Sequence, residues 1–388
     1  MEGVVTSKHY RMNLSSVMEN SQQVIDRDLE YICNSLEVEF THLSGSGLLI
    51  TGGAGFLGYY LIQSILHWNE SMDEAKQIRV LVFDNYIRGV PVWLSKLETD
   101  KNLSLVKYDV TNRFRNGIGD FEYIIHAASI ASPTYYRKHP IETMDANVNG
   151  LRSLLEYCIS QKQKKSNVKG FLFFSSSEVY GDPSDENIPT PEIYRGNVSC
   201  TGPRSCYDES KRFGETLCVN FAKHYDLPIR IARPFNNSGP GLKITDGRVL
   251  PDFVRNVLTG KDIVIFSDGS PTRTFCYVAD AIVGYYKILV RGRNGEAYNI
   301  GVEQPEISIA NLAERVAALA KQLFGYQGQV LRKVNHEHDY LIDNPKRRCP
   351  MIHKARTELS FNPGTSLDDG LRRSLIWYGD NRETGDAS

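Results

Sequence analysis

An α/β fold with a doubly wound parallel sheet is the fold class that the sequence predicts. Between residues 47 and 236, short apolar runs alternate with helical stretches, which is the pattern of successive strand–helix–strand units. The chain has 388 residues, 41% of them hydrophobic and 23% charged, and is long enough for a main domain and a second lobe. We therefore expect a main domain over 45–236 and a smaller lobe over 237–388, which can also return strands or helices to the first domain.

Six apolar runs are the predicted strands of this sheet. They cover 48–51, 80–83, 103–106, 123–126, 171–174 and 229–232. Short runs of this kind are typical of parallel strands that helices cover on both faces. After about residue 236 the sequence changes to loops rich in Gly and Pro, with a helical stretch over 308–324 and an apolar-patterned stretch over 367–378. This part is the predicted second lobe.

The first 44 residues precede the alternating pattern and are predicted to form a helical extension. Within 17–40 the apolar residues Ile25, Leu29, Ile32 and Leu36 recur at the spacing of one helical face. An amphipathic helix of this kind buries its apolar face against a partner surface. We expect it to pack on the main body or on a second subunit.

The composition restricts the class of partner. The net charge of −1 gives no overall attraction to nucleic acid or to an anionic membrane, so a small molecule is the expected partner. No uncharged apolar run approaches the roughly 20 residues that cross a bilayer. The seven cysteines include no C-x-x-C pair and fit neither a disulfide framework nor a zinc site. We therefore expect a cytoplasmic protein without a metal centre.

The strongest local signal is a glycine-rich turn between a predicted strand and a predicted helix. Gly52, Gly55 and Gly58 follow the apolar run 48–51 and open a helical stretch that extends to Leu66. Glycines at this spacing permit unusual backbone angles, let a pyrophosphate approach the backbone N–H groups, and let the helix pack closely on the strand. The turn therefore predicts a Rossmann-type dinucleotide site.

An acidic residue at the end of the next strand indicates which dinucleotide binds. The carboxylate of Asp84 would accept hydrogen bonds from the adenosine ribose and would repel a 2′-phosphate, which favours NAD over NADP. Arg88 lies four residues further on and keeps NADP open as an alternative.

Two further stretches predict the chemistry. Ser176 follows the apolar run 171–174, and Tyr207 and Lys211 lie four residues apart, on one face of a predicted helix. A phenol with a pKa near 10 is a poor base at neutral pH, but a lysine ammonium and an oxidised nicotinamide ring would stabilise the phenolate. Tyr207 could then take a proton from a sugar hydroxyl that Ser176 holds.

Jointly these motifs resemble the extended short-chain dehydrogenase/reductases that act on nucleotide sugars. The resemblance covers about 47–378 and rests on Asn147 and on the stretches 51–58, 84–85, 126–129, 176–181, 207–211, 233–236 and 272–275. It implies an NAD cofactor, a substrate-binding second lobe and a homodimer. Within the family the chain is most similar to the UDP-glucuronate decarboxylases, at 131–133 with Tyr136, 177–183, 202–209, 246–249 and 345–348.

This resemblance implies a specific reaction. Oxidation of C4 of UDP-glucuronate gives a β-keto acid, which loses carbon dioxide, after which C5 is protonated and C4 is reduced again, so that NAD ends unchanged and UDP-xylose is formed. Ser177 stands where dTDP-glucose dehydratases have an aspartic acid that donates a proton to the leaving hydroxyl. GDP-mannose dehydratases share the serine, so 4,6-dehydration remains the second hypothesis. Simple 4-epimerisation is the third. The fourth hypothesis is a non-catalytic regulator that binds NAD and a sugar nucleotide. This hypothesis predicts the loss of a catalytic residue, but Ser176, Tyr207 and Lys211 are all present.

The resemblance also assigns the site residues. The catalytic group is Ser176, Glu178, Tyr207 and Lys211. Besides Tyr207 and Lys211, the NAD-binding residues are Gly52, Gly55, Phe56, Leu57, Gly58, Asp84, Asn85, Asp109, Val110, Ala127, Ala128, Ser129, Asn147 and Pro234. The substrate-binding residues are Pro133, Ser177, Glu178, Arg204, Asn236, Arg248, Val249, Arg273 and Arg347, with the Arg273 guanidinium near the phosphates or the carboxylate. Departures from the family at Ile130, Ser176 and 237–238 lie near the expected sugar pocket.

Overall fold

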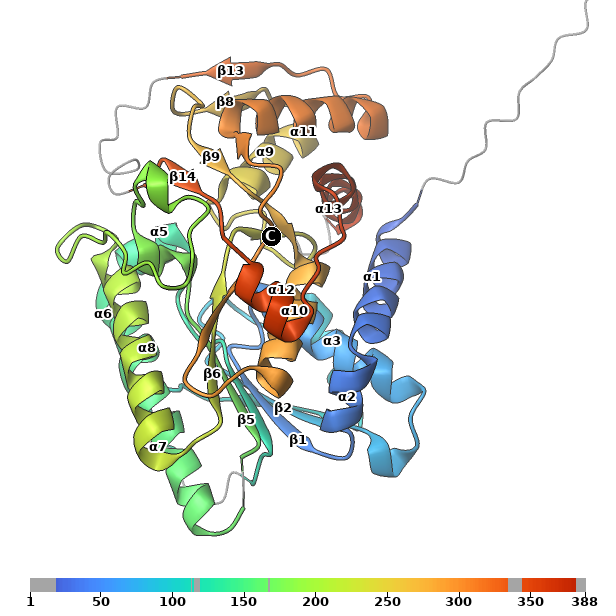
Figure 1. The fold of residues 1–388 in the computed structure, drawn as a ribbon. Coiled ribbons are helices and arrows are strands. Elements are labelled where there is room, and N and C mark those ends of the chain that lie inside the picture. The colour runs from blue at the N-terminus through green and yellow to red at the C-terminus, as the bar shows by residue number, and fades with distance from the viewer. Residues whose placement is uncertain (1–18, 113, 115–118, 167, 334–343, 382–388) are drawn as a thin grey trace, which may run out of the picture.

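The structure is a computed structural model that describes residues 19–112, 114, 119–166, 168–333 and 344–381. A central parallel sheet lies between two layers of helices, and a second group of helices and short strands lies beyond one end of the sheet (Figure 1). Within the described residues, no helix combines the length and the apolar character needed to span a bilayer.

The central sheet has seven strands in the order β11-β6-β5-β4-β1-β2-β3, and all neighbours are parallel. The strands are β1 (Gly47–Thr51), β2 (Arg79–Asp84), β3 (Leu103–Lys107), β4 (Tyr123–His126), β5 (Gly170–Phe174), β6 (Ile229–Pro234) and β11 (Ala297–Ile300). The six predicted strands are confirmed, and β11 is an additional one. The strand order reverses between β1 and β4, and in such sheets the crevice beyond the carboxyl ends at this point binds ligands.

Two helix layers cover the sheet because its strands are apolar on both faces. Leu48 and Ile50 of β1 belong to the larger core, and Leu49 between them belongs to the second core on the opposite face. The larger core contains α3 (Phe56–Glu70) and α10 (Val278–Arg291), whereas α7 (Leu151–Gln163) and α8 (Ser205–Tyr225) form the second. All residues of β1 are buried, as expected for a central parallel strand.

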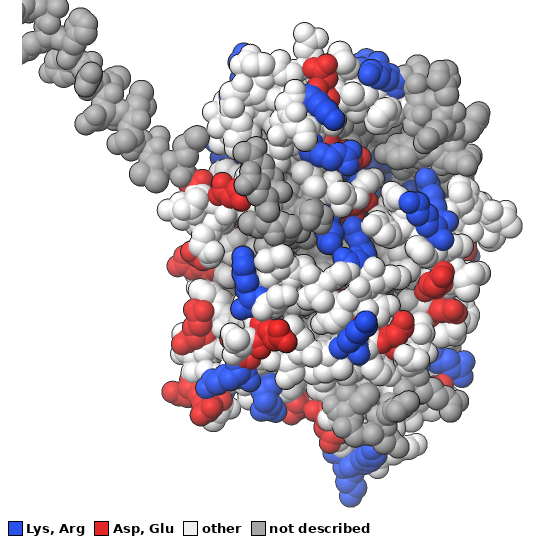
Figure 2. All heavy atoms as spheres, turned by 180° about the vertical axis from the view of Figure 1, so that it is seen from behind, with Lys and Arg blue, Asp and Glu red and all other residues white. Residues whose placement is uncertain are grey.

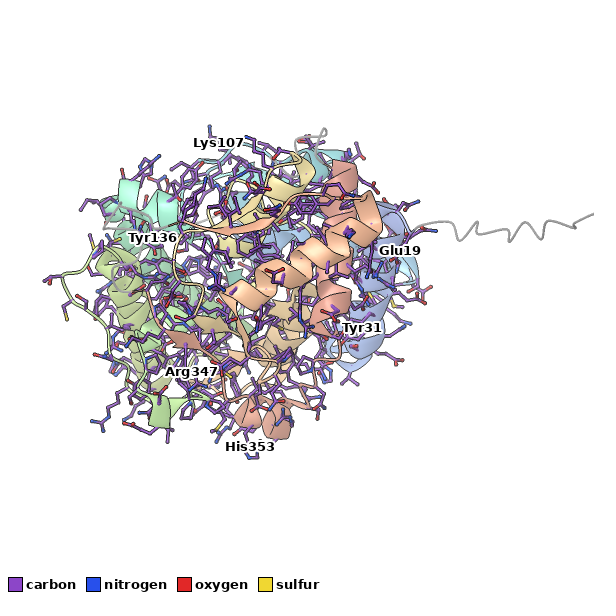
Figure 3. All side chains as sticks on the ribbon, turned by 90° about the horizontal axis from the view of Figure 1, so that it is seen from above. Glu19, Tyr31, Lys107, Tyr136, Arg347 and His353 are labelled. Atoms are coloured by element: carbon purple, nitrogen blue, oxygen red, sulfur yellow. The ribbon has the colours of Figure 1, made fainter. Side chains whose placement is uncertain are left out.

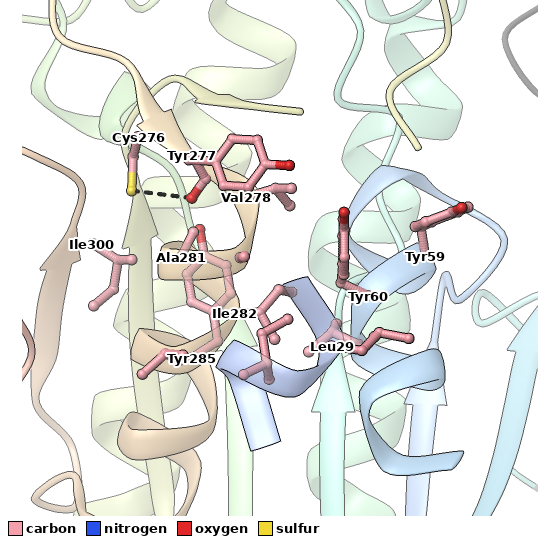
Figure 4. Close-up of a cluster of buried hydrophobic side chains, with 14 of the residues drawn as sticks. Leu29, Tyr59, Tyr60, Cys276, Tyr277, Val278, Ala281, Ile282, Tyr285 and Ile300 are labelled. Atoms are coloured by element: carbon pink, nitrogen blue, oxygen red, sulfur yellow. Dashed lines mark hydrogen bonds between the residues drawn. The ribbon is translucent and has the colours of Figure 1, made fainter. Parts of the chain in front are cut away.

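The N-terminal extension packs on the outer side of α3 and α10. It forms α1 (Ser21–Ser35) and α2 (Glu37–Leu43), and α1 begins with a capping box between Asn20 and Gln23. Leu29 of α1 lies between Ile282 of α10 and Tyr60 of α3 (Figure 4). The predicted amphipathic helix is therefore confirmed, and of the two surfaces considered for it, it covers the main body.

A buried carboxylate fixes α1 to the helices α3 and α13 and to the strand β10. Asp28 accepts hydrogen bonds from Tyr60, from Tyr277 and, at 2.6 Å, from Arg373 of α13. Burial raises the pKa of Asp28 despite these hydrogen bonds. Helix α1 is thus held both by its buried apolar side chains and by the hydrogen bonds of Asp28.

The second half of the chain forms the elements beyond the carboxyl ends of the sheet strands. They include α9 (Val249–Leu258), α11 (Ile309–Phe324), α13 (Leu367–Asn381), and the strands β7 (Asn237–Ser238), β8 (Ile263–Ile265), β9 (Thr272–Arg273), β10 (Cys276–Tyr277), β12 (Ile307–Ser308), β13 (Val330–Arg332) and β14 (Arg347–Arg348), whereas α12 (His353–Leu359) packs on α10 and β11. Helix α11 confirms the helical stretch predicted over 308–324, and the apolar-patterned stretch 367–378 lies in helix α13. In contrast, α10 and β11 join the central sheet domain.

Short helical elements connect the sheet to the site. They are α4 (Val92–Lys96), α5 (Pro133–Lys138), α6 (Pro140–Asp145), the π-helical turn η2 (Ala146–Gly150), and the 3₁₀ turns η1 (Glu74–Lys76), η3 (Ser177–Tyr180) and η4 (Asp185–Asn187). Two of them, α5 and η3, directly follow the ends of β4 and β5 and therefore lie at the crevice.

Candidate active site

A cavity of about 780 Å³ lies at the carboxyl ends of the strands, where the strand order reverses. It is lined by the glycine turn, the ends of β2 to β5, the start of α8, and segments of the second half that include α9 and β9. This volume is in the range of small-molecule sites. Lys and Arg side chains lie in and around a hollow near the middle of the face shown in Figure 2.

The glycine turn leaves no room for side chains. Gly52 has a φ of +73°, and a Cβ there would lie 2.5 Å from Cα of Ala128. A Cβ on Gly58 would lie 1.9 Å from the carbonyl oxygen of Gly53. Helix α3 begins at Phe56 with Gly55 as its N-cap and no side-chain cap, so its first N–H groups are available to a phosphate.

The acidic residues at the ends of β2 and β3 lie beside this turn. Asp84 accepts hydrogen bonds from the backbone N–H groups of Ala54 (3.0 Å) and Tyr86 (2.8 Å), and burial raises its pKa. Asn85 donates to Asp109 at 3.2 Å. Asp84, Asn85 and Asp109 all line the cavity. Asp84 therefore both fixes the turn and presents a carboxylate to a ligand held there.

Arg88, the residue because of which NADP remained an alternative cofactor, points toward the second lobe. It donates to Asp246 at 2.7 Å, and its guanidinium lies 4.6 Å from the ring centroid of Tyr135. This arginine is therefore already paired with a carboxylate.

These features fit a dinucleotide. The turn is a cradle that a side chain would fill, and an acidic residue follows at the end of the next strand. Two buried polar atoms nearby, Oγ of Ser129 and Oδ1 of Asn147, have no hydrogen-bond partner in the described part of the chain. Asn147 lies in the π-helical turn η2 and donates to Ser210 at 2.9 Å. The other predicted cofactor residues that line the cavity are Phe56, Leu57, Val110, Ala127, Ala128 and Pro234, whereas Gly58 and Asn147 do not line it.

Tyr207 lies in the first turn of α8 and faces the same cavity. Its ring stacks on Tyr136, with centroids 5.2 Å apart and an interplanar angle of 14°. Burial raises the pKa of Tyr207 to about 12, against the lowering effects of a hydrogen bond with Ser176 and of the positive charge of Arg248. The structure thus brings Ser176 and Tyr207 together, as the sequence predicts.

Lys211 lies one turn further along α8 and contacts the end of β5. Its Nζ donates to the carbonyl oxygen of Phe174 at 2.7 Å and lies 5.8 Å from the ring centroid of Tyr207. Burial lowers the pKa of Lys211 to about 7. In this structure the amine is therefore held by a carbonyl group behind the phenol rather than by the phenol itself.

Glu178 is surrounded by arginines. Its Oε2 accepts hydrogen bonds from Arg204 and, at 2.7 Å, from Arg348. Burial alone would raise the pKa of Glu178, but Arg204, Arg348, Arg273 and Arg248 together hold it below its usual value. The group is therefore a carboxylate within a positive environment.

The sequence interpretation selected Arg347, but Arg348 is the residue next to Glu178. Neighbouring residues of a strand point to opposite sides, and both belong to β14. Arg348 donates to the carbonyl oxygens of Ser177 and Gly181, both at 2.9 Å. Arg347 pairs with Glu306 at 2.7 Å and lies outside the large cavity, and its position is labelled in Figure 3.

Arg273 and Arg204 both line the cavity, and each already has partners. Arg273 donates to the carbonyl oxygens of Pro345 (2.6 Å) and Thr272 (2.7 Å), and burial lowers its pKa to about 10. Arg204 lies 3.6 Å from Asp208, whose pKa is raised to about 7 by burial and by the negative charge of Glu178. Asp208 was not among the predicted site residues, although it directly follows Tyr207 in sequence.

The remaining predicted substrate residues also line the cavity, namely Pro133, Ser177, Asn236, Arg248 and Val249. Tyr136 and Asp246 line it as well and were missed as site residues. The available signal for Tyr136 was its place in the stretch that resembles the decarboxylases. Seen from above, Tyr136 lies on the opposite side of the molecule from Tyr31 of α1 (Figure 3), and no residue of α1 lines the cavity.

Fold and site together define a class of protein. A Rossmann-type sheet presents a glycine turn for a dinucleotide, and a serine, a tyrosine and a lysine lie in or beside the same cavity. The chain belongs to the NAD dependent epimerase/dehydratase family, whose model matches residues 48–301.

Curated relatives and solved structures agree with this assignment. The chain is 36% identical over 324 residues to UDP-glucuronic acid decarboxylase 3 of Arabidopsis thaliana, covering 84% of this chain and 86% of the relative. It is 32% identical over 389 residues to UDP-glucuronic acid decarboxylase 1 of Xenopus tropicalis, covering 95% and 84%. A solved UDP-glucose 4-epimerase of Thermotoga maritima has a TM-score of 0.71 at 25% identity, covering 87% of this chain and 99% of the other. These findings confirm the predicted family and fold, and the family match confirms NAD as the cofactor.

Proposed function

We propose that the chain is an NAD-dependent carboxy-lyase that converts UDP-glucuronate to UDP-xylose. The observation that carries this proposal is that the Ser176–Tyr207 pair and the carboxylate of Glu178, with its group of arginines, line the same cavity. The decarboxylase relatives, at 32 and 36% identity, support the choice of substrate.

Tyr207 and Ser176 act at C4 of the sugar. Ser176 holds the C4 hydroxyl, and Tyr207 accepts its proton. NAD, when bound on the glycine turn, supplies the hydride acceptor for this oxidation and the hydride donor for the later reduction. The predicted cofactor residues that line the cavity hold it there, with Asp84 at the adenosine ribose.

The carboxylate is lost because C4 has become a ketone. The C5–C6 bond breaks, its electron pair moves into the C4 carbonyl as an enolate, and C6 leaves as carbon dioxide. Tyr207, now protonated, and Ser176 donate hydrogen bonds to the enolate oxygen. C5 then takes a proton from a water that Glu178 positions, and the hydroxide left behind takes a proton from the solvent, so that one solvent proton is consumed for each carbon dioxide released. Tyr207 returns its proton to the C4 oxygen as the ketone is reduced.

The charges of the cavity suit an anionic substrate. Arg204, Arg248 and Arg273 line the cavity, and Arg348, which does not line it, donates a hydrogen bond to Glu178. Planar guanidinium groups suit both a diphosphate and a sugar carboxylate. Ser177 has no acidic group to protonate a leaving hydroxyl, which makes decarboxylation the better supported reaction over 4,6-dehydration.

The experiment that tests this function follows carbon dioxide and the sugar together. The protein is incubated with UDP-glucuronate and NAD, carbon dioxide is measured, and the sugar protons are followed by NMR. We expect a UDP-pentose and no lasting NADH. A 4-keto-6-deoxy product from a nucleotide hexose, with no reaction of UDP-glucuronate, would contradict the proposal.

We further propose a cytoplasmic homodimer. All seven cysteines are free thiols, and five of them are buried, which supports a reducing compartment. Exposed apolar side chains on α6 and α8, namely Ile141, Met144 and Phe213, support an oligomer. Light scattering of the purified chain tests the dimer, and a mass of one chain at micromolar concentration would contradict it.

A further inference from the structure

Asp246 lies between two arginines that come from different parts of the chain. Its Oδ1 accepts a hydrogen bond from Arg88 at 2.7 Å, and its Oδ2 lies 3.0 Å from Nε of Arg248. The side chain of Asp246 is only 4% exposed. Its backbone carbonyl oxygen also accepts a hydrogen bond from Ser132 at 2.8 Å. The carboxylate is therefore paired with both arginines, and only its Oδ1 accepts a hydrogen bond within the described residues.

The two arginines also have neighbours in different parts of the proposed reaction site. Arg88 follows Asp84 and Asn85, the residues at the ribose end of the cofactor site. Its position is reinforced by stacking on Tyr135, and its backbone carbonyl oxygen accepts a hydrogen bond from Lys243 at 3.2 Å. Arg248 instead lies near Tyr207 and lowers the pKa of that phenol.

We propose that Asp246 is a positioning residue that couples these two parts of the site, and that the Arg88–Asp246 ion pair is a clasp that slows release of the bound cofactor. The inference rests on the proposed NAD site. Both partners line the cavity that contains the glycine turn, and their ion pair joins the loop after β2 to the segment before α9. Because NAD is regenerated within each turnover, slow release does not limit the rate.

The first test measures cofactor release from an Arg88→Gln variant. Bound NADH is displaced by excess NAD in a stopped-flow instrument, and the loss of NADH fluorescence gives the release rate. A charged, largely buried hydrogen bond of this kind contributes enough to make release roughly tenfold faster when it is removed. An unchanged release rate would overturn the clasp.

The matched control is Arg152→Gln. Arg152 pairs with Glu156 at 2.9 Å on the exposed face of α7, and neither residue lines the cavity. This variant should release NADH at the unmodified rate, which separates the clasp from a general effect of losing an arginine. If NADH does not bind to the unmodified protein at all, it is the proposed NAD site that fails.

The second test uses Asp246→Asn, which removes both ion pairs. The charged and titratable groups near Tyr207 are Arg248, Glu178, Asp208, Lys211 and Tyr136. One of these groups, Arg248, is held in place by Asp246 and lowers the pKa of Tyr207. In Asp246→Asn we therefore expect faster NADH release together with a shift of the rising limb of the kcat–pH profile to higher pH. Arg88→Gln should change the rate of NADH release but not the kcat–pH profile, because Arg248 keeps its ion pair with Asp246. If Asp246→Asn lowers only the melting temperature, Asp246 has a merely structural role and the coupling is overturned.

Discussion

The cavity has two walls that are built by different means. The cofactor wall consists of residues within 52–57, 84–85, 109–110 and 127–129, which follow the ends of β1 to β4 in order and act mainly through backbone and small residues. The substrate wall consists of long charged side chains from separate segments, chiefly Glu178, Arg204, Arg248 and Arg273. The first wall depends on close steric fit, and the second on a balance of charges.

This difference determines how each wall fails. In the glycine turn that forms part of the cofactor wall an added methyl group has no space, because Gly52 and Gly58 lie against backbone atoms. On the substrate wall a side chain of equal size can be substituted, but a removed charge leaves its buried partners unpaired. Tyr207 and Lys211 lie where the two walls meet, and substitutions there should affect chemistry without affecting the shape of either wall.

The largest expected effect follows removal of the Tyr207 hydroxyl. Tyr207→Phe keeps the ring that stacks on Tyr136 but removes the group that accepts the C4 proton. We expect kcat to fall by roughly 10³-fold or more, since general acid–base groups contribute about 10² to 10⁴. Carbon dioxide release measures the loss. NADH affinity should be unchanged, and appreciable turnover by this variant would remove Tyr207 from the mechanism.

The next effect tests the steric character of the cofactor wall. Gly52→Ala places a methyl group 2.5 Å from Cα of Ala128 at a φ of +73°. Strain and overpacking together should weaken NADH binding on the order of 100-fold. Fluorescence titration measures the affinity.

Gly325→Ala is the matched control for this substitution. Gly325 also has a positive φ, of +67°, but a Cβ there would meet no atom within 4 Å. It ends α11 away from the cavity, so we expect a stability loss of about 1 kcal/mol and normal NADH binding. Equal NADH affinities of the two variants would show that steric fit does not define the cofactor wall.

A smaller effect tests the charge balance of the substrate wall. Glu178→Gln keeps the size of the side chain but removes the charge that Arg204 and Arg348 share. We expect kcat to fall roughly 10- to 100-fold, with NADH affinity retained and a loss of stability of about 1–3 kcal/mol. The exposed Glu156→Gln on α7 serves as a control for kcat and melting temperature. A fully active Glu178→Gln enzyme would exclude a role for this carboxylate.

The two walls also differ in how far the sequence predicts them. The residues of the cofactor wall could be predicted from the sequence because they follow consecutive strands, and because the glycine spacing reflects steric requirements within one turn. The sheet was predicted for the same reason, except that β11 lies beyond a long stretch of other elements and pairs with β6 from a distance. Local pattern contains no information about such pairing.

The substrate wall was predicted only where resemblance supplied the residues. Asp246 and Arg88 are 158 positions apart in sequence, so their ion pair could not be inferred from spacing. The sequence interpretation selected Arg347 although Arg348 is the arginine next to Glu178, and the reason is simpler. A one-residue difference in a strand changes the side of the sheet to which a side chain points. Two adjacent arginines are indistinguishable until the pairing of β14 with β9 is known.

The smallest effect concerns the pH dependence of stability at the place where the walls meet. Burial lowers the pKa of Lys211 from 10.5 to about 7 in the folded chain. Between these values the unfolded chain binds a proton that the folded chain does not, so this lysine makes the free energy of unfolding rise with pH, by at most about 1.4 kcal/mol per unit. Lys211→Met, of similar size but uncharged, should remove this contribution, and urea unfolding at pH 7 and pH 9 measures it. Lys223→Met, at an exposed position of the same helix, is the control. If the stability of Lys211→Met follows pH as the unmodified protein does, the amine is protonated in the folded chain, and its charge would then be available to the Tyr207 phenolate even before the cofactor binds.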